Sequence, residues 1–142
     1  MSKLEALQET QVRKLLKALK HLSYSYEKVK KLSTDVAELD DETLETWESF
    51  AARFSRVSDM FLTRYLRSKV LLTDPGFSGS LRDFLNQAEK LDMIEGADTW
   101  MSIRELRNIS AHDYSEQDLS AFFNRLLEEC PSLLAIQHQL TS

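Results

Sequence analysis

Apolar positions in the first thirty residues recur at alternating steps of three and four. This spacing places them on one face of a helix with 3.6 residues per turn, and lysines flank that face. The apolar positions are Val12, Leu15, Leu19, Leu22, Tyr26 and Val29. The pattern predicts one long amphipathic helix, which ends in the polar stretch "STDVAELDDE" at residues 33–42.

A second long helix is predicted to start between residues 40 and 43 and to run to about Leu72. Its apolar positions are Leu44, Trp47, Phe50, Ala51, Phe54, Val57, Phe61, Leu62, Tyr65 and Leu66. This face is wider than contact with one neighbour requires, so we expect the helix at the centre of the fold, or partly at a subunit interface. Core packing is the default for these side chains.

Shorter helices are expected after a break at Pro75 and Gly76. Ser80, followed three residues later by Asp83, predicts a capping box that opens a third helix. Gly96 is expected to mark the end of that helix.

Two further segments complete the predicted helices. Asp98 is expected to cap the segment that begins near it, and Ser115 with Asp118 predicts a second capping box at the start of the last helix. Pro131 is expected to bend or restart that last helix.

The chain contains no internal repeat and no sign of a domain boundary. With three glycines and two prolines in 142 residues, it also lacks the turn residues that a sheet protein needs. We therefore expect one all-α domain over residues 1–142, folded as an antiparallel bundle of four to five helices.

Charge is arranged in blocks along the chain. Residues 11–31 and 51–72 are basic, residues 35–48 are acidic, and the net charge is −5. The net charge argues against broad non-specific binding to nucleic acid. The basic blocks indicate either solvated helix faces or a surface for phosphate groups or an acidic partner protein.

The remaining composition narrows the class of protein. No apolar run approaches the roughly 18 residues of a membrane span, so we expect a soluble, cytoplasmic protein with no membrane partner. Cys130 is the sole cysteine and is expected to fill space in a helix. His21 and His138 are isolated surface residues in this interpretation, and no metal-ligand spacing occurs.

Residues 107–114, "RNISAHDY", gather Arg107, Asn108, His112 and Tyr114 within eight positions. On one unbroken helix, residues five apart point about 140° away from each other. Because Ser115 predicts a new helix start, His112 falls in the connection and can turn back toward Arg107. The sequence permits a shared site at this point.

This stretch resembles the R-x4-H-x-Y signature of HEPN domains, most closely the HepT-like toxins and the related nucleotidyltransferase substrate-binding proteins. The order of long and short helices is also similar over most of the chain. The resemblance implies a homodimeric, metal-independent endoribonuclease that acts on RNA without a cofactor. His112 would be the acid and base, Arg107 would hold the phosphate, and Asn108 would orient the phosphate or the imidazole.

The resemblance also implies a partner and a modification. In the toxin branch, a minimal nucleotidyltransferase antitoxin attaches AMP to the motif tyrosine, here Tyr114, and silences the nuclease. The other expectation for Tyr114 is that its ring packs over the final helix. In the second helix Arg53 and Phe54 match many relatives and Ser55 departs, while Asp59 is one position off a family acid; Arg53 and Asp59 are thus auxiliary candidates.

Three functions remain open at this point. The chain is an endoribonuclease toxin restrained by its nucleotidyltransferase, or a non-catalytic subunit that presents substrate to a nucleotidyltransferase, or a structural bundle in which the motif arose by chance. The intact set of Arg107, His112 and Tyr114 favours the first two. Activity that depends on His112 separates them.

Overall fold

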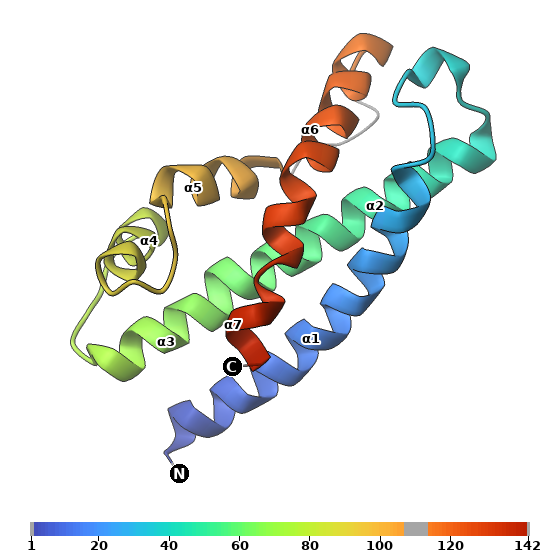
Figure 1. Ribbon diagram of the computed structural model, residues 1–142. Coiled ribbons are helices and arrows are strands. Elements are labelled where there is room, and N and C mark those ends of the chain that lie inside the picture. The colour runs from blue at the N-terminus through green and yellow to red at the C-terminus, as the bar shows by residue number, and fades with distance from the viewer. Residues whose placement is uncertain (1, 107–113, 142) are drawn as a thin grey trace.

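The computed structural model describes residues 2–106 and 114–141, and all regular structure in these ranges is helical (Figure 1). This confirms the all-α prediction. The elements are α1 (Lys3–Val29), η1 (Val36–Glu38), α2 (Asp41–Asp59), η2 (Met60–Tyr65), α3 (Leu66–Thr73), α4 (Leu81–Lys90), α5 (Ala97–Glu105), α6 (Glu116–Leu134) and α7 (Gln137–Thr141).

Two long helical stretches form the frame of the molecule. α1 packs along α2, η2 and α3, which continue one another as a single rod running in the opposite direction (Figure 1). α6 lies across α1 and α2, and α7 contacts α1. α4 and α5 pack against each other near the α3 end of the rod.

The predicted apolar face of α1 is the face that it buries. Leu15, Leu19, Leu22 and Val29 are at most 1% exposed, whereas Val12 and Tyr26 are half-buried at its edge. The helix starts at Ser2, whose hydroxyl accepts a hydrogen bond from the Glu5 N–H. The side-chain cap satisfies a backbone donor that has no partner inside the helix.

The rod supplies the largest buried side chains, which confirms its central position. Trp47, Phe50, Phe54 and Phe61 are fully buried within the single chain, and Tyr65 is 5% exposed. These rings are therefore not available as a dimer surface. The expectation that this face lines a subunit interface does not hold for them.

One turn of the rod departs from the uninterrupted α-helix that the sequence predicts. Residues Met60–Tyr65 form a π-helix, a wider turn with hydrogen bonds to the fifth residue. The Thr63 hydroxyl donates to the Asp59 carbonyl at 2.6 Å within it. A π-helix has more residues in a turn than an α-helix. The apolar spacing does not reveal this, because Phe61, Leu62 and Tyr65 are buried here, as an α-helical core face also predicts.

α4 begins as predicted. The Ser80 hydroxyl accepts from the Asp83 N–H at 3.2 Å, and Asp83 Oδ2 accepts from the Ser80 N–H at 2.9 Å, so the capping box is complete. The helix does not extend to Gly96, however. It ends at Lys90, and Asp92 takes the left-handed conformation with φ 57°.

The expected cap at Asp98 is also wrong. α5 begins at Ala97, two residues before the start that a cap at Asp98 would give, and Gly96 is its N-cap in a left-handed conformation of φ 67°. Asp98 lies inside the first turn of α5. A glycine adopts this backbone conformation without the steric cost of a Cβ.

α6 begins where the sequence predicts. The Ser115 hydroxyl accepts from the Asp118 N–H at 3.1 Å, which supplies the first half of the expected capping box. Pro131 does not restart the helix, which continues to Leu134. None of the helices in the described ranges combines the length and apolar character that crossing a bilayer requires.

Replacement of one buried leucine tests this packing. Leu22 is fully buried and Leu7 is 50% exposed on the same helix. Leu22→Ala is expected to lower the free energy of unfolding by about 2–5 kcal/mol, because a cavity adds to the lost transfer energy. Leu7→Ala is the matched control, with an expected change of about 0.5 kcal/mol or less. Urea unfolding measures both, and equal losses would contradict the assigned face of α1.

The α4 capping box predicts a pH dependence. Hydrogen bonds from the backbone N–H and the hydroxyl of Ser80 hold the pKa of Asp83 below its ordinary value. A carboxylate whose pKa is lowered by folding stabilises the fold above its unfolded pKa, and this contribution disappears as pH falls through the folded pKa. Asp83→Asn should therefore be less stable than the wild type at pH 7, and the difference should shrink progressively as the pH falls below about 4, the ordinary pKa of an aspartate. Thermal unfolding from pH 3 to pH 7 checks this, and a constant difference would refute it.

Candidate functional site

The candidate site is bounded by the end of α5 and the start of α6. Leu106 is the C-cap of α5 and is 7% exposed, and Ser115 is the N-cap of α6. Arg107, Asn108 and His112 lie between these caps, outside the described residues. The predicted helix start at Ser115 is confirmed, while the convergence of Arg107 with His112 stays a prediction.

α5 is held on the rod by apolar contacts. Its Trp100 lies 5.0 Å from Phe61 of η2, measured between ring centres, and Ile103 is fully buried. The π-helix thus contributes directly to the surface on which α5 rests. Turns of this kind occur frequently at functional sites.

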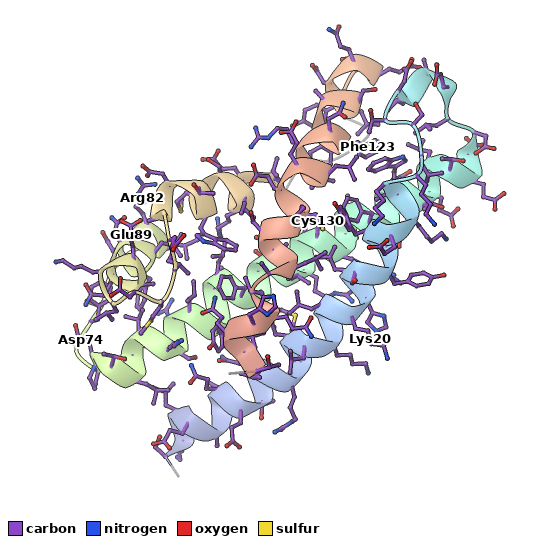
Figure 2. All side chains as sticks on the ribbon, in the orientation of Figure 1. Lys20, Asp74, Arg82, Glu89, Phe123 and Cys130 are labelled. Carbon is purple, nitrogen blue, oxygen red and sulfur yellow. The ribbon has the colours of Figure 1, made fainter. Side chains whose placement is uncertain are left out.

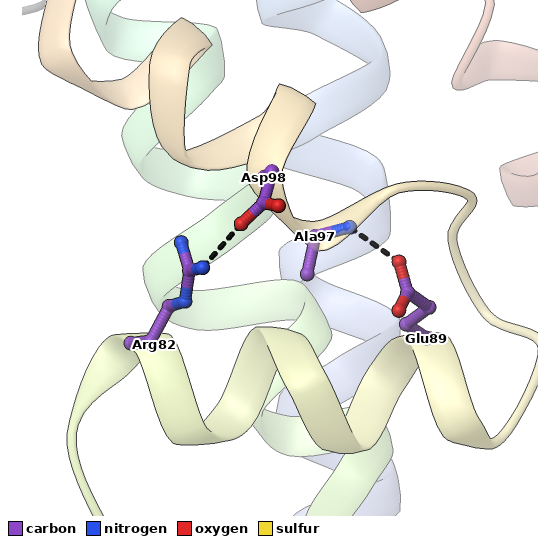
Figure 3. Close-up of polar contacts among 4 residues, drawn as sticks. All are labelled: Arg82, Glu89, Ala97 and Asp98. Atoms are coloured by element: carbon purple, nitrogen blue, oxygen red, sulfur yellow. Dashed lines mark hydrogen bonds and ion pairs between the residues drawn. The ribbon is translucent and has the colours of Figure 1, made fainter.

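α4 fixes the other end of α5 by polar contacts (Figure 3). The Ala97 N–H donates to Glu89 Oε2 at 2.6 Å, and Arg82 forms an ion pair with Asp98. Glu89 therefore supplies the side-chain acceptor that Asp98 was expected to provide. No local pattern in the sequence reveals this, since the two partners lie eight residues apart and on different helices.

α6 is anchored by one aromatic stack and one loop contact. The rings of Phe123 and Trp47 stack with centres 4.7 Å apart and planes at 12°. The Ser120 hydroxyl accepts from the Val36 N–H of η1 at 2.9 Å. Figure 2 labels Phe123 on the half of α6 that is nearer to the start of the helix. The start of α6 at Ser115 is thus held in place by the contacts of α6 with α2 and η1.

Tyr114 is the one member of the motif that the structure describes. It directly precedes the α6 N-cap, and 39% of its surface is exposed. Part of this residue is thus accessible to solvent, and the packing of its ring over the final helix stays a prediction. A tyrosine with this exposure is accessible to a modifying enzyme.

The two auxiliary candidates lie on different sides of the rod. Six residues separate Arg53 from Asp59, which places them about 120° apart around a helix. The Arg53 guanidinium donates to the His21 carbonyl at 3.1 Å and to the Ser25 hydroxyl at 2.8 Å. Arg53 thus holds the rod to α1. Asp59 is half-buried where α2 meets η2.

The other reactive residue types are not arranged for catalysis in the described ranges. Cys130 is fully buried, and burial raises the pKa of its thiol to about 12, so the thiol stays protonated at neutral pH. His21 and His138 are exposed. No group of three or more metal-ligating side chains occurs among the residues that the structure describes.

Comparison with known proteins adds no relative. No family model, curated protein or solved structure matches the chain. The features of the chain that indicate a function are therefore the motif and the helices around it.

Proposed function

We propose that this chain is a HEPN-type toxin, a metal-independent endoribonuclease that a cognate minimal nucleotidyltransferase neutralises in the cytoplasm. The observation that carries the proposal is the spacing of Arg107, Asn108, His112 and Tyr114 in residues 107–114. The confirmed start of α6 at Ser115 supports it, because a break in the helix is the condition under which Arg107 and His112 share a site.

The chemistry requires no metal. The imidazole of His112 accepts the proton of a ribose 2′-hydroxyl, whose oxygen attacks the adjacent phosphorus. The bond from phosphorus to the 5′-oxygen breaks, and this oxygen takes up a proton from the imidazolium. A group with a pKa near 6.5 serves as both base and acid at neutral pH. Arg107 stabilises the extra charge on the phosphate oxygens, and Asn108 orients the phosphate or the imidazole.

Regulation follows from the position of Tyr114. Transfer of AMP from ATP to its hydroxyl, with release of pyrophosphate, places a negatively charged group two residues from His112, where it repels an RNA phosphate. The exposed ring of Tyr114 supports this role, since the nucleotidyltransferase must reach the hydroxyl. The active form in this proposal is a homodimer, and its contact surface lies outside the aromatic face that the chain buries in its own core.

A second candidate is a non-catalytic subunit that presents substrate to a nucleotidyltransferase. Two observations favour it over the toxin: the net charge of −5, and the use of Arg53 to hold α1 against the rod. An arginine held in this contact is less available as the auxiliary catalytic group that the HEPN resemblance implies. Co-purification with a nucleotidyltransferase is expected of both candidates, so activity has to separate them.

Cleavage that depends on His112 tests the toxin. The wild type, purified free of AMP as judged by intact mass, should cut RNA in the presence of EDTA. His112→Ala should lower the rate by at least about 100-fold, the usual contribution of a general acid and base. His138→Ala, at an exposed histidine, is the control and should cut at the wild-type rate. A folded wild type that does not cut would reject the toxin and leave the non-catalytic subunit.

Removal of one hydroxyl tests the modification. Incubation with the cognate nucleotidyltransferase and ATP should add AMP to the wild type and abolish its cleavage. Tyr114→Phe should keep its nuclease activity, gain no mass, and stay active after the same incubation. Tyr24→Phe, at another exposed tyrosine, should be modified like the wild type. Modification of Tyr114→Phe would place the acceptor elsewhere.

A further inference from the structure

α1 exposes a row of cations with one aromatic ring among them. Arg13, Lys17, Lys20, Tyr24 and Lys28, which we call the basic stripe, recur at steps of four and three residues. At 100° per residue they fall within an arc of about 80°, and at 1.5 Å per residue they extend over about 22 Å. All five are exposed, and Figure 2 shows Lys20 on the outer side of α1.

The charges of the stripe are not neutralised by the protein. In the described part of the chain, none of its four cations forms an ion pair. Glu27 is the only carboxylate between Arg13 and Lys31, and it pairs with Lys30 at 2.6 Å. The stripe is therefore a local positive surface on a chain whose net charge is negative.

Tyr24 is the most exposed large apolar residue of the described chain, with 63% of its surface accessible. The Lys28 ammonium lies 5.8 Å from the centre of its ring, and the Arg53 guanidinium lies 6.0 Å from it. The bonds from Arg53 to α1 fix the position of that second cation. The ring is thus accessible and has two cations beside it, one on Lys28 and one on Arg53.

A hollow of about 540 Å³ lies beside the ring, between α1 and the start of α2. Its lining includes Tyr24, Lys28, Lys31, Leu32, Glu27 and Glu42. It is large enough to admit a nucleobase, and its two carboxylates are acceptors for base amino groups.

We propose that the basic stripe binds single-stranded nucleic acid, with the phosphates along the cations and one base stacked on Tyr24. Surfaces that bind single strands without strict sequence preference combine a cationic track with an exposed aromatic ring. A membrane surface fits less well, because a helix lying in a bilayer exposes its apolar face and α1 buries that face in the core. The choice of RNA as the bound strand rests on the proposed function.

Binding is measured on the full-length His112→Ala chain, which does not cut, by fluorescence anisotropy of a labelled oligouridylate over a series of salt concentrations. As a second measurement that does not depend on this variant, the wild type is titrated with the 2′-deoxy form of the same oligonucleotide. A strand without 2′-hydroxyls cannot be cleaved by their attack. Lys17→Gln with Lys20→Gln should weaken binding. It should also reduce the slope of log affinity against log salt by about 1.4, or about 0.7 for each lost phosphate contact.

Two controls make the result specific. Lys3→Gln with Lys90→Gln makes the same change in net charge at exposed lysines outside the stripe and should leave affinity and slope unchanged. Tyr24→Ala should weaken binding about tenfold through lost stacking, whereas Tyr24→Phe should bind like the wild type.

Several results would overturn the inference. They are equal affinities of the stripe and control variants, an unchanged affinity of Tyr24→Ala, or stripe-dependent binding to anionic vesicles or polyglutamate without binding to the oligonucleotide. The two proposals fail separately. If the wild type cuts RNA but the stripe substitutions do not change binding, only the inference about the stripe is rejected. If binding depends on the stripe but the wild type does not cut, only the nuclease proposal is rejected.

Discussion

The stack of Trp47 on Phe123 joins the parts of the fold that determine where the candidate site lies. Trp47 also donates its indole N–H to the Ser33 carbonyl at 3.0 Å, so one side chain links α2, α6 and the turn after α1. A buried indole needs such a partner for its N–H. The direction of α6, and with it the place of Tyr114, follows from this contact.

The same packing decides which surfaces remain for partners. The chain uses the aromatic face of the rod internally, so the apolar groups that would attract a second subunit are already buried. Polar and charged helix faces remain outside. The large apolar residues that stay exposed among the described residues are Leu7, Tyr24 and Tyr114, so we expect partner binding to depend largely on charge and to be sensitive to salt.

Features that depend on local spacing were predictable from the sequence. The buried face of α1, the capping box at Ser80 and Asp83, and the start of α6 at Ser115 all follow from residues three or four apart. The π-turn, the left-handed Asp92 and the cap from Glu89 were not, because each depends on contacts between helices. Within the candidate site, the helix start at Ser115 was predictable from local spacing, whereas the convergence of Arg107 with His112 lies outside the described residues and stays a prediction.

The hydrogen bond between Glu89 and Ala97 has a consequence for the local unfolding of α4 and α5. Helices of about ten residues are not stable alone in water, and α5 takes its N-terminal hydrogen bond from α4. Neither helix keeps its full set of contacts without the other. We therefore expect α4 and α5 to open together as one small cooperative unit, while the contacts between α1 and α2 remain formed.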